Sequence, residues 1–221
     1  MASPRLVSIW LALGVAAPGC SPGGAACAGP TCGAGYECLA NRCAVAGGVP
    51  VPRDSERIVL SPIELVTSGR SSAPEVTLAS STRRDSFVLA RFGSSYKDGS
   101  EIAAAFLLLT ITPGTAPVAE DVPLDVWTVG QSWSADSVAR GSLPGFSRPV
   151  AHGIARTSPA LPVRVDVTHL VRELARTPGD DGLGVVASGA SGTAVTLVTA
   201  AAGAPRLEVY LARPRRAQAA W

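Results

Sequence analysis

Between residues 57 and 212 the chain is a series of short apolar segments, each four to eleven residues long and bounded by Gly, Pro, Ser or Asp. Regularly spaced apolar runs of this length are typical of β-strands separated by turns. The sequence therefore predicts an all-β sandwich of about ten strands. The predicted strands are 57–60, 75–79, 86–92, 101–111, 122–129, 149–155, 162–168, 182–188, 194–200 and 205–212.

Alternation within these segments indicates which strands have one polar face. In 163–167 every second residue is valine, with Arg164 and Asp166 between them, and in 206–211 Glu208 and Tyr210 alternate with aliphatic residues. A period of two with one polar face suits a sheet that is covered on one side. Segment 101–111 is apolar on both faces, which predicts a central strand; its Ala and Leu residues also allow a helix.

Segment 168–176, "THLVRELAR", is the exception to the strand pattern. Thr168 suits an N-cap, and Leu170, Val171 and Leu174 fall on one side of a helix. The following "TPGDDG" contains the Pro and Gly residues that end helices. We therefore expect one short helix lying across an end of the sandwich.

The first 19 residues have the features of an export signal. Arg5 precedes an apolar stretch at 6–17, which is too short to span a membrane, and "PGC" follows. Cys20 stands where a lipoprotein signal places its acylated cysteine. We expect lipidation at Cys20 and an envelope location, outer-membrane or cell-surface; ordinary signal cleavage near Ala17 is the alternative.

All five cysteines lie between residues 20 and 43. If Cys20 is acylated, four remain, and in an oxidising compartment these can form two disulfides. We favour the pairs Cys27–Cys38 and Cys32–Cys43, although three pairings are open. Zinc is the rival interpretation, but the spacings fit CxxC zinc sites poorly. Residues 20–46 are thus predicted to be a Cys-rich stalk module, followed by a linker at 47–56, the sandwich at 57–212 and a basic tail at 213–221.

The charge of the chain limits its partners. There are 19 basic and 17 acidic residues, a net charge of +2, and no basic stripe along the main domain. This balance does not indicate nucleic-acid binding. The tail 213–221, "RPRRAQAAW", is interpreted as solvated, with binding to anionic envelope polymers or head groups as the alternative.

The candidates for catalysis and for metal binding are few. The histidines are His152 and His169, and Asp166 lies three residues before His169, where an aspartate most simply binds local backbone N–H groups. No GxSxG motif supplies a nucleophile, so no catalytic residue is predicted. Asp180 and Asp181 could join a calcium site but lack a DxDxDG loop. We therefore interpret them as turn residues and expect no cofactor.

The candidate ligand-binding residues are Trp127, Asp125, Arg91 and Arg164. Trp127 shares strand parity with Asp125, opposite Leu124 and Val126, which predicts partial exposure. An exposed aromatic ring can stack on a sugar, and the two arginines could pair with uronate carboxylates. The stronger interpretation is that Trp127 packs in the core or at an edge, and that Trp133 belongs to the core.

The order of six segments resembles the DNRLRE-type domain of secreted bacterial and archaeal surface proteins. These are "FVLARF", "SEIAAAFLLLTI", "PLDVWTVGQSW", "VRVDVTHLVREL", "GDDGLGVVAS" and "APRLEVYL", and the resemblance covers roughly residues 57–212. The matching positions are Leu89, Arg91, Phe92, Ile102, Ala105, Leu107, Leu109, Trp133, Asp166, Val167, Thr168, Leu170, Val171, Pro205, Leu207 and Val209. The second Trp usual in the family is missing, since "SVAR" ends in Arg140.

The resemblance implies a jelly-roll-like, non-catalytic module. Some relatives resemble carbohydrate-binding modules for acidic polysaccharides, and others belong to adhesins. We therefore expect a surface protein that binds polysaccharide or has a structural or adhesive role. The alternatives are a polysaccharide lyase or glycoside hydrolase on the same scaffold, or a protein-interaction module of an envelope assembly.

Overall fold

The computed structural model describes most of the predicted sandwich and a small part of the cysteine-rich segment. Of the residues 146–149 and 201, and of the strands at 36–39 and 42–45, only the backbone is described. The described ranges are 36–39, 42–45, 51–68, 74–81, 85–96, 101–112, 121–156, 162–176, 182–189 and 192–213.

The elements follow the predicted order closely. The strands are β1 (Tyr36–Leu39), β2 (Arg42–Val45), β3 (Ser55–Leu60), β4 (Pro62–Thr67), β5 (Glu75–Ala79), β6 (Val88–Phe92), β7 (Ile102–Leu109), β8 (Val122–Val129), β9 (Phe146–Ala155), β10 (Val163–Asp166), β11 (Leu183–Ala187), β12 (Ala194–Val198) and β13 (Arg206–Ala212). The helices are α1 (Ala135–Ala139), α2 (Thr168–Arg176) and the 3₁₀ turn η1 (Ala201–Gly203).

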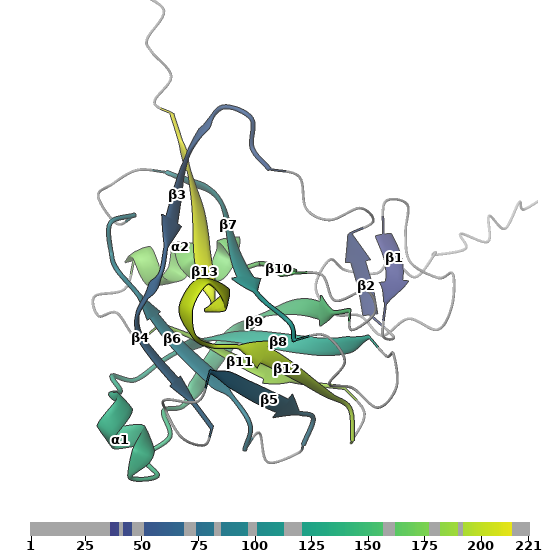
Figure 1. Ribbon diagram of the computed structural model, residues 1–221. Helices are drawn as coiled ribbons and strands as arrows, with labels where there is room; N and C mark the ends of the chain where they lie inside the picture. The colour runs from purple at the N-terminus through teal and green to yellow at the C-terminus, as the bar shows by residue number, and fades with distance from the viewer. Residues whose placement is uncertain are drawn as a thin grey trace, which may run out of the picture.

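The strands form two main antiparallel sheets (Figure 1). One has four strands in the order β10-β7-β13-β3, and the other has five in the order β4-β6-β11-β8-β9. The ribbon β12-β5 continues the first sheet, because Ile111 just beyond β7 bridges to Leu197 in β12. The all-β sandwich is therefore confirmed. The central position of β7 is also confirmed, since it lies between β10 and β13.

A single apolar core fills the space between the two sheets. The four-stranded sheet contributes Ala105, Leu107 and Val209, and the five-stranded sheet contributes Leu124 and Val185, all of them almost fully buried. Each fully buried aliphatic side chain of this size stabilises the fold by about 1.5–3 kcal/mol. The period-two pattern of the sequence therefore marks the face of each strand that turns inward.

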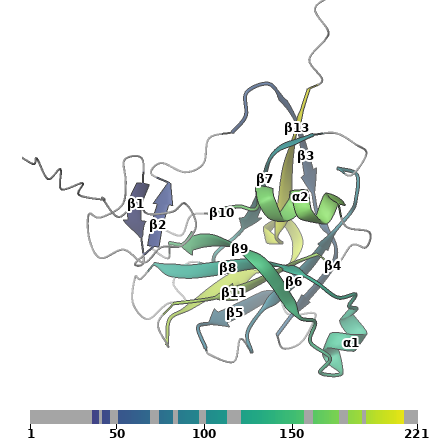
Figure 2. The ribbon, with the colours of Figure 1, turned by 180° about the vertical axis from the view of Figure 1, so that it is seen from behind.

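Helix α2 has the predicted bounds and buries the predicted residues. Leu170, Val171 and Leu174 belong to the main core, so the helix closes one side of the sandwich (Figure 2). The predicted cap is wrong in detail. Thr168 is the first helical residue, and its N–H and its hydroxyl both donate to Asp166 Oδ1, at 2.9 and 2.6 Å. Asp166 thus stabilises the turn into the helix.

Strands β1, β2 and β4, helix α1 and the 3₁₀ turn η1 were not predicted. Strand β4 follows β3 after one residue, and this single break hides it in the sequence pattern. Helix α1 has only five residues, too few to show helical periodicity, and is held by a capping box between Ser134 and Ser137. The hairpin β1-β2 sets Cys38 opposite Cys43 along the backbone. The predicted disulfides and lipidation remain predictions, since Cys20, Cys27 and Cys32 and all cysteine side chains lie outside the described residues.

Gly182, directly before β11, has a positive φ of 86°. A Cβ at this position would lie 2.4 Å from the carbonyl oxygen of Ala90 in β6. Both the left-handed backbone and the close approach require glycine. The residue that ends the predicted "GDDG" turn is therefore fixed by the pairing of β11 with β6.

Candidate functional site

The outer face of the four-stranded sheet carries a cluster of arginines around two aromatic rings. The cross-strand register places Phe106 beside Glu208, and Tyr210 beside Arg57. Arg164 and Arg206 are each opposite Leu108, from the two strands that flank β7. We call this surface the arginine face and define it by Arg57, Phe106, Arg164, Arg206, Glu208 and Tyr210.

Glu208 is the centre of the arginine face. It is only 5% exposed, although it points away from the core. Its carboxylate accepts a hydrogen bond from Arg57 Nη2, and Tyr210 Oη lies 3.2 Å from Oε2. Arg164 Nη2 lies 3.7 Å from the same Oε2. One buried carboxylate therefore holds two guanidinium groups on the surface of the sheet.

The pKa of Arg57 is raised by this environment. The main cause is its hydrogen bond to Glu208, and the lesser Coulomb attraction of Glu208 acts in the same direction, whereas burial opposes both. Because the folded-state pKa is raised, this contribution to stability is complete at any pH below the ordinary pKa of arginine. It is lost only as the pH rises through the raised value, so the arginine stays charged throughout the neutral range.

Aromatic rings form the base beneath the arginines. The guanidinium carbon of Arg164 lies 3.5 Å from the ring centroid of Phe106. The rings of Phe106 and Tyr210 meet edge to face, with centroids 5.8 Å apart and an interplanar angle of 80°. Stacking of this kind orients a guanidinium and leaves its edge free for hydrogen bonds. Arg164 is thus positioned both by the ring below it and by the carboxylate beside it.

The arginine face has the chemistry to bind carboxylates. The side chains of Arg57 and Arg164 are 55% and 31% exposed, so each presents part of its guanidinium to solvent. A guanidinium has five N–H donors and matches a carboxylate in bidentate geometry. Since the two arginines share one carboxylate and Arg206 adds a third exposed cation, the face keeps an excess of positive charge.

Of the four predicted ligand-binding residues, the structure places only Arg164 on this face. Arg91, Asp125 and Trp127 lie on the outer side of the five-stranded sheet. Arg91 donates to Glu64 Oε2 at 2.6 Å and to the backbone oxygen of Trp133, and its guanidinium lies over the Trp133 ring. Arg91 therefore ties β6 to the segment that leads into α1.

Trp127 is buried, as the stronger of its two interpretations predicted, and it lacks the partial exposure that sugar stacking would need. The ring is 7% exposed and packs in a second apolar cluster with Trp133 and with Val138 of α1. The physical reason is that the unpredicted helix α1 and the segment before it supply the side chains that cover the outer side of the sheet. Trp133 is buried, as predicted. Asp125 Oδ1 and His152 Nδ1 lie 2.8 Å apart, at hydrogen-bond distance.

The sequence analysis missed Arg57, Arg206, Glu208 and Tyr210. One signal was available: alternation in 206–211 sets Glu208 and Tyr210 on the same face. The arrival of Arg57 and Arg164 beside them is a matter of strand order, because β3, β13, β7 and β10 are far apart in the chain. Spacing along a single strand could not have identified this cluster.

The remaining residues considered from the sequence either have a structural role, are exposed on the surface, or lie outside the described residues. Asp166 is engaged by Thr168, and His169 is exposed on α2. Asp180 and Asp181 lie outside the described residues. Within the described ranges, no three His, Cys, Asp or Glu side chains come close enough together to hold a metal ion. No helix in the described part of the chain is long and apolar enough to cross a membrane.

In comparisons with known proteins, no family model matches the chain and no curated protein matches it significantly. The resemblance to the DNRLRE-type domain therefore stays a prediction. The structure itself defines the class as an all-β sandwich with a cationic, aromatic-backed sheet face.

Proposed function

We propose that this chain is an exported, non-catalytic envelope protein whose sandwich binds carboxylated polysaccharide through the arginine face. The observation that carries the proposal is the buried carboxylate of Glu208, which fixes Arg57 and Arg164 on an exposed sheet surface. Burying a carboxylate is costly unless it is paired, so Glu208 keeps both arginines beside it on the surface of the sheet. The geometry therefore favours a surface built to present guanidinium groups.

The shape of the face suits an extended polymer. Arg164 and Arg206 lie on either side of Leu108, two strand spacings or about 10 Å apart. A flat sheet with cations at this separation can contact carboxylates on more than one sugar along a chain. Arginines that are pre-positioned lose less side-chain entropy on binding than free ones. The excess positive charge also attracts a polyanion from solution.

The non-catalytic part of the proposal rests on the surroundings of the predicted acid–base candidates. The Asp166 carboxylate accepts two hydrogen bonds from Thr168, and His169 lies on the exposed side of α2. Asp166 therefore stabilises the first turn of α2, which is a structural role. The proposal also retains the jelly-roll-like, DNRLRE-type class suggested by the order of the strand segments.

Titration of the full chain with polygalacturonate tests the proposed binding. We expect Arg164→Gln to weaken the affinity about tenfold, which is the loss of one charge-assisted hydrogen bond. We also expect binding to weaken as salt is raised. Isothermal titration calorimetry against polygalacturonate, with uncharged dextran as the reference polymer, measures both effects.

The matched control is Arg140→Gln, which removes an exposed arginine at the end of α1, on the other side of the sandwich. Its affinity should equal that of the parent chain. Equal losses from Arg140→Gln and Arg164→Gln would show that net charge, and not the arginine face, binds the polymer. If the parent chain binds no carboxylated polymer, the structural or adhesive role is the one that remains.

The envelope location is tested through Cys20. We expect metabolic labelling with a palmitate analogue to label the parent chain and to fail with Cys20→Ala, because the acyl groups are attached to that cysteine. The substituted chain should also leave the membrane fraction. An unlabelled parent chain would refute the lipid anchor and favour ordinary signal cleavage near Ala17.

A further inference from the structure

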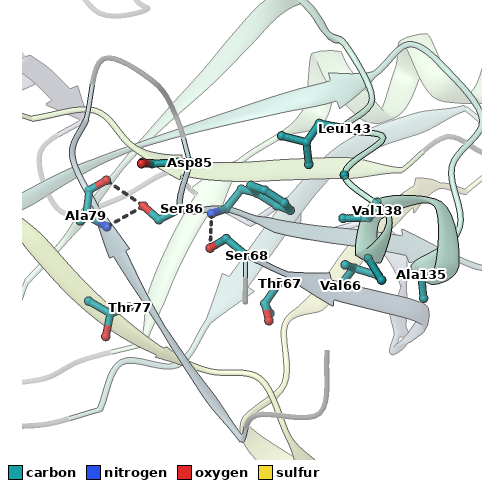
Figure 3. A pocket seen from close by; sticks show the side chains of 13 residues that line it. Val66, Thr67, Ser68, Thr77, Ala79, Asp85, Ser86, Ala135, Val138 and Leu143 are labelled. Carbon is teal, nitrogen blue, oxygen red and sulfur yellow. Dashed lines mark hydrogen bonds between the residues drawn. The ribbon is translucent and has the colours of Figure 1, made fainter. Parts of the chain in front are cut away.

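An open groove, away from the arginine face, lies between the ends of β4 and β5 and helix α1 (Figure 3). The groove has a volume of about 960 Å³. Small-molecule sites in proteins commonly have volumes of about 300–1,000 Å³. None of the residues of the arginine face lines it, so it is a separate site.

The two sides of the groove differ in chemistry. Strand β4, strand β5 and the segment before β6 supply hydroxyl groups and one carboxylate, and α1 with the loop after it supplies apolar side chains. Figure 3 shows Val138 and Leu143 on one side, and Ser86, Asp85 and Thr77 across from them. The lining residues are Val66, Thr67, Ser68, Thr77, Ala79, Asp85, Ser86, Phe87, Ala135, Val138, Ala139, Gly141 and Leu143.

Backbone groups at the groove are already satisfied by serine side chains. Ser86 Oγ accepts from Ala79 N and donates to Ala79 O, both at 2.8 Å, and Ser68 Oγ accepts from Phe87 N at 2.9 Å. These bonds occupy the outward polar groups of β5 at Ala79. An extended peptide that adds a strand needs those groups free. Ala79 is therefore closed to strand addition, and at this end of the groove the side chains are the groups that can bind a ligand.

Some hydroxyl groups at the groove can still donate a hydrogen bond to such a ligand. Ser68 Oγ is an acceptor towards Phe87, which leaves its own O–H without a partner among the described residues. Thr77 Oγ1 and Thr196 Oγ1 lie 2.9 Å apart, so one hydroxyl donates to the other. The O–H of the accepting hydroxyl can then point elsewhere. Leu143, one of the few large apolar side chains exposed in the described structure, is 54% exposed.

The apolar wall is held rigidly. Ser134 and Ser137 form the capping box of α1, and Glu64 Oε1 accepts from the first helical N–H, at Ala135, with a distance of 2.6 Å. The other Glu64 oxygen binds Arg91, so helix, β4 and β6 are joined through one carboxylate. A pre-formed wall lowers the entropy lost when a ligand is bound.

We infer that the groove binds an uncharged sugar ring. A pyranose has an apolar C–H face that can lie against Leu143 and Val138, and hydroxyls at its edge that match the serine and threonine side chains. One of the lining residues, Asp85, is a carboxylate, and a negative charge in the lining disfavours a uronate. The molecule thus has two sites of different chemistry, one for neutral sugar and one for carboxylated polymer.

Amide chemical shifts of the full chain, labelled with ¹⁵N, test the inference with three trisaccharides of similar size. Cellotriose and triacetylchitotriose are uncharged, and trigalacturonate carries three carboxylates. We expect at least one neutral trisaccharide to shift the amides of Ser68, Phe87 and Leu143, and trigalacturonate to leave them unchanged. Arg83 and Arg84 precede Asp85 in the sequence and lie outside the described residues. The charged probe therefore reports any cation that they add.

Leu143→Asp is the decisive substitution. The exposed side chain permits it without loss of the fold, and the new charge on the apolar wall should weaken the neutral ligand at least about tenfold. Ser142→Asp is the matched control, because it places the same charge on the adjacent exposed residue, which does not line the groove. It should change the affinity by less than about twofold.

Thr77→Val removes one hydroxyl from the opposite side and should weaken binding by roughly threefold, the effect of one neutral hydrogen bond. Three results would overturn the inference: no neutral trisaccharide shifts the groove amides, trigalacturonate shifts them, or Ser142→Asp weakens binding as much as Leu143→Asp. Binding of polygalacturonate at the arginine face is measured separately, so either site can fail without the other.

Discussion

At the scale of single residues, Glu208 and Asp125 are the buried acidic side chains of the described structure, and Glu208 is the one on the arginine face. Glu208 belongs to a strand whose inward residues, Leu207 and Val209, are fully buried, and it is itself almost inaccessible on the outward side. Its partners come from three strands: Arg57 from β3, Arg164 from β10 and Tyr210 from β13 itself. The side chain therefore connects the strands of one sheet through their outer face.

Glu208→Gln should lower the free energy of unfolding by about 2 kcal/mol. The amide keeps the shape of the side chain but leaves two neighbouring guanidinium groups without a counter-charge in a partly desolvated site. Chemical denaturation with urea measures the change. A double-mutant cycle with Arg164→Gln should give a non-zero coupling energy; strict additivity would show that the 3.7 Å pair contributes nothing.

At the scale of the elements, α2 shows how a short helix is specified. Its apolar residues face the core, its exposed Arg172 donates from Nε and Nη2 to the carbonyl of Ile102, and Asp166 binds its first N–H. The helix has nine residues, too few to be stable alone, so packing and the Asp166 contact hold it together.

Asp166→Ala should destabilise the protein by about 1 kcal/mol, the usual cost of losing a helix-start acceptor. His169→Ala, on the exposed side of the same helix, should change the stability by less than about 0.5 kcal/mol. Thermal unfolding followed by circular dichroism compares the two. An equal effect of the two substitutions would contradict the structural role assigned to Asp166.

At the scale of the whole molecule, the sandwich and the cysteine-rich segment are predicted to differ in what stabilises them. Strands β3 to β13 enclose a large apolar core and contain no cysteine, whereas all five cysteines lie between residues 20 and 43. A segment with four cysteines and almost no aliphatic residues depends on cross-links for its stability.

Reduction should therefore leave the thermal unfolding midpoint of the sandwich unchanged to within about 1 °C, whereas loss of a disulfide that supports a fold typically costs about 2–5 kcal/mol. Fluorescence of the buried Trp127 and Trp133, recorded with and without a phosphine reductant, reports on the sandwich. A clear drop in the midpoint would show that the cysteine-rich segment stabilises the sandwich.

The sequence by itself determined most of the strands of the main domain and helix α2, because periodicity is a local property. The alternating 163–167, the doubly apolar 101–111 and the amphipathic 168–176 all became the expected elements. Helix α1 was not predicted because five residues are too few to show helical periodicity. Strand β4 was not predicted because a single residue separates it from β3.

Only the tertiary structure decided which outward side chains are exposed. Trp127 and Arg91 both point away from the core. However, α1 packs over Trp127, and Arg91 forms an ion pair with Glu64. Arg164 has the same parity and stays accessible, next to Arg57 and Glu208. Parity fixes the side of a sheet on which a residue points, whereas strand order and the packing of distant segments fix what lies on that side.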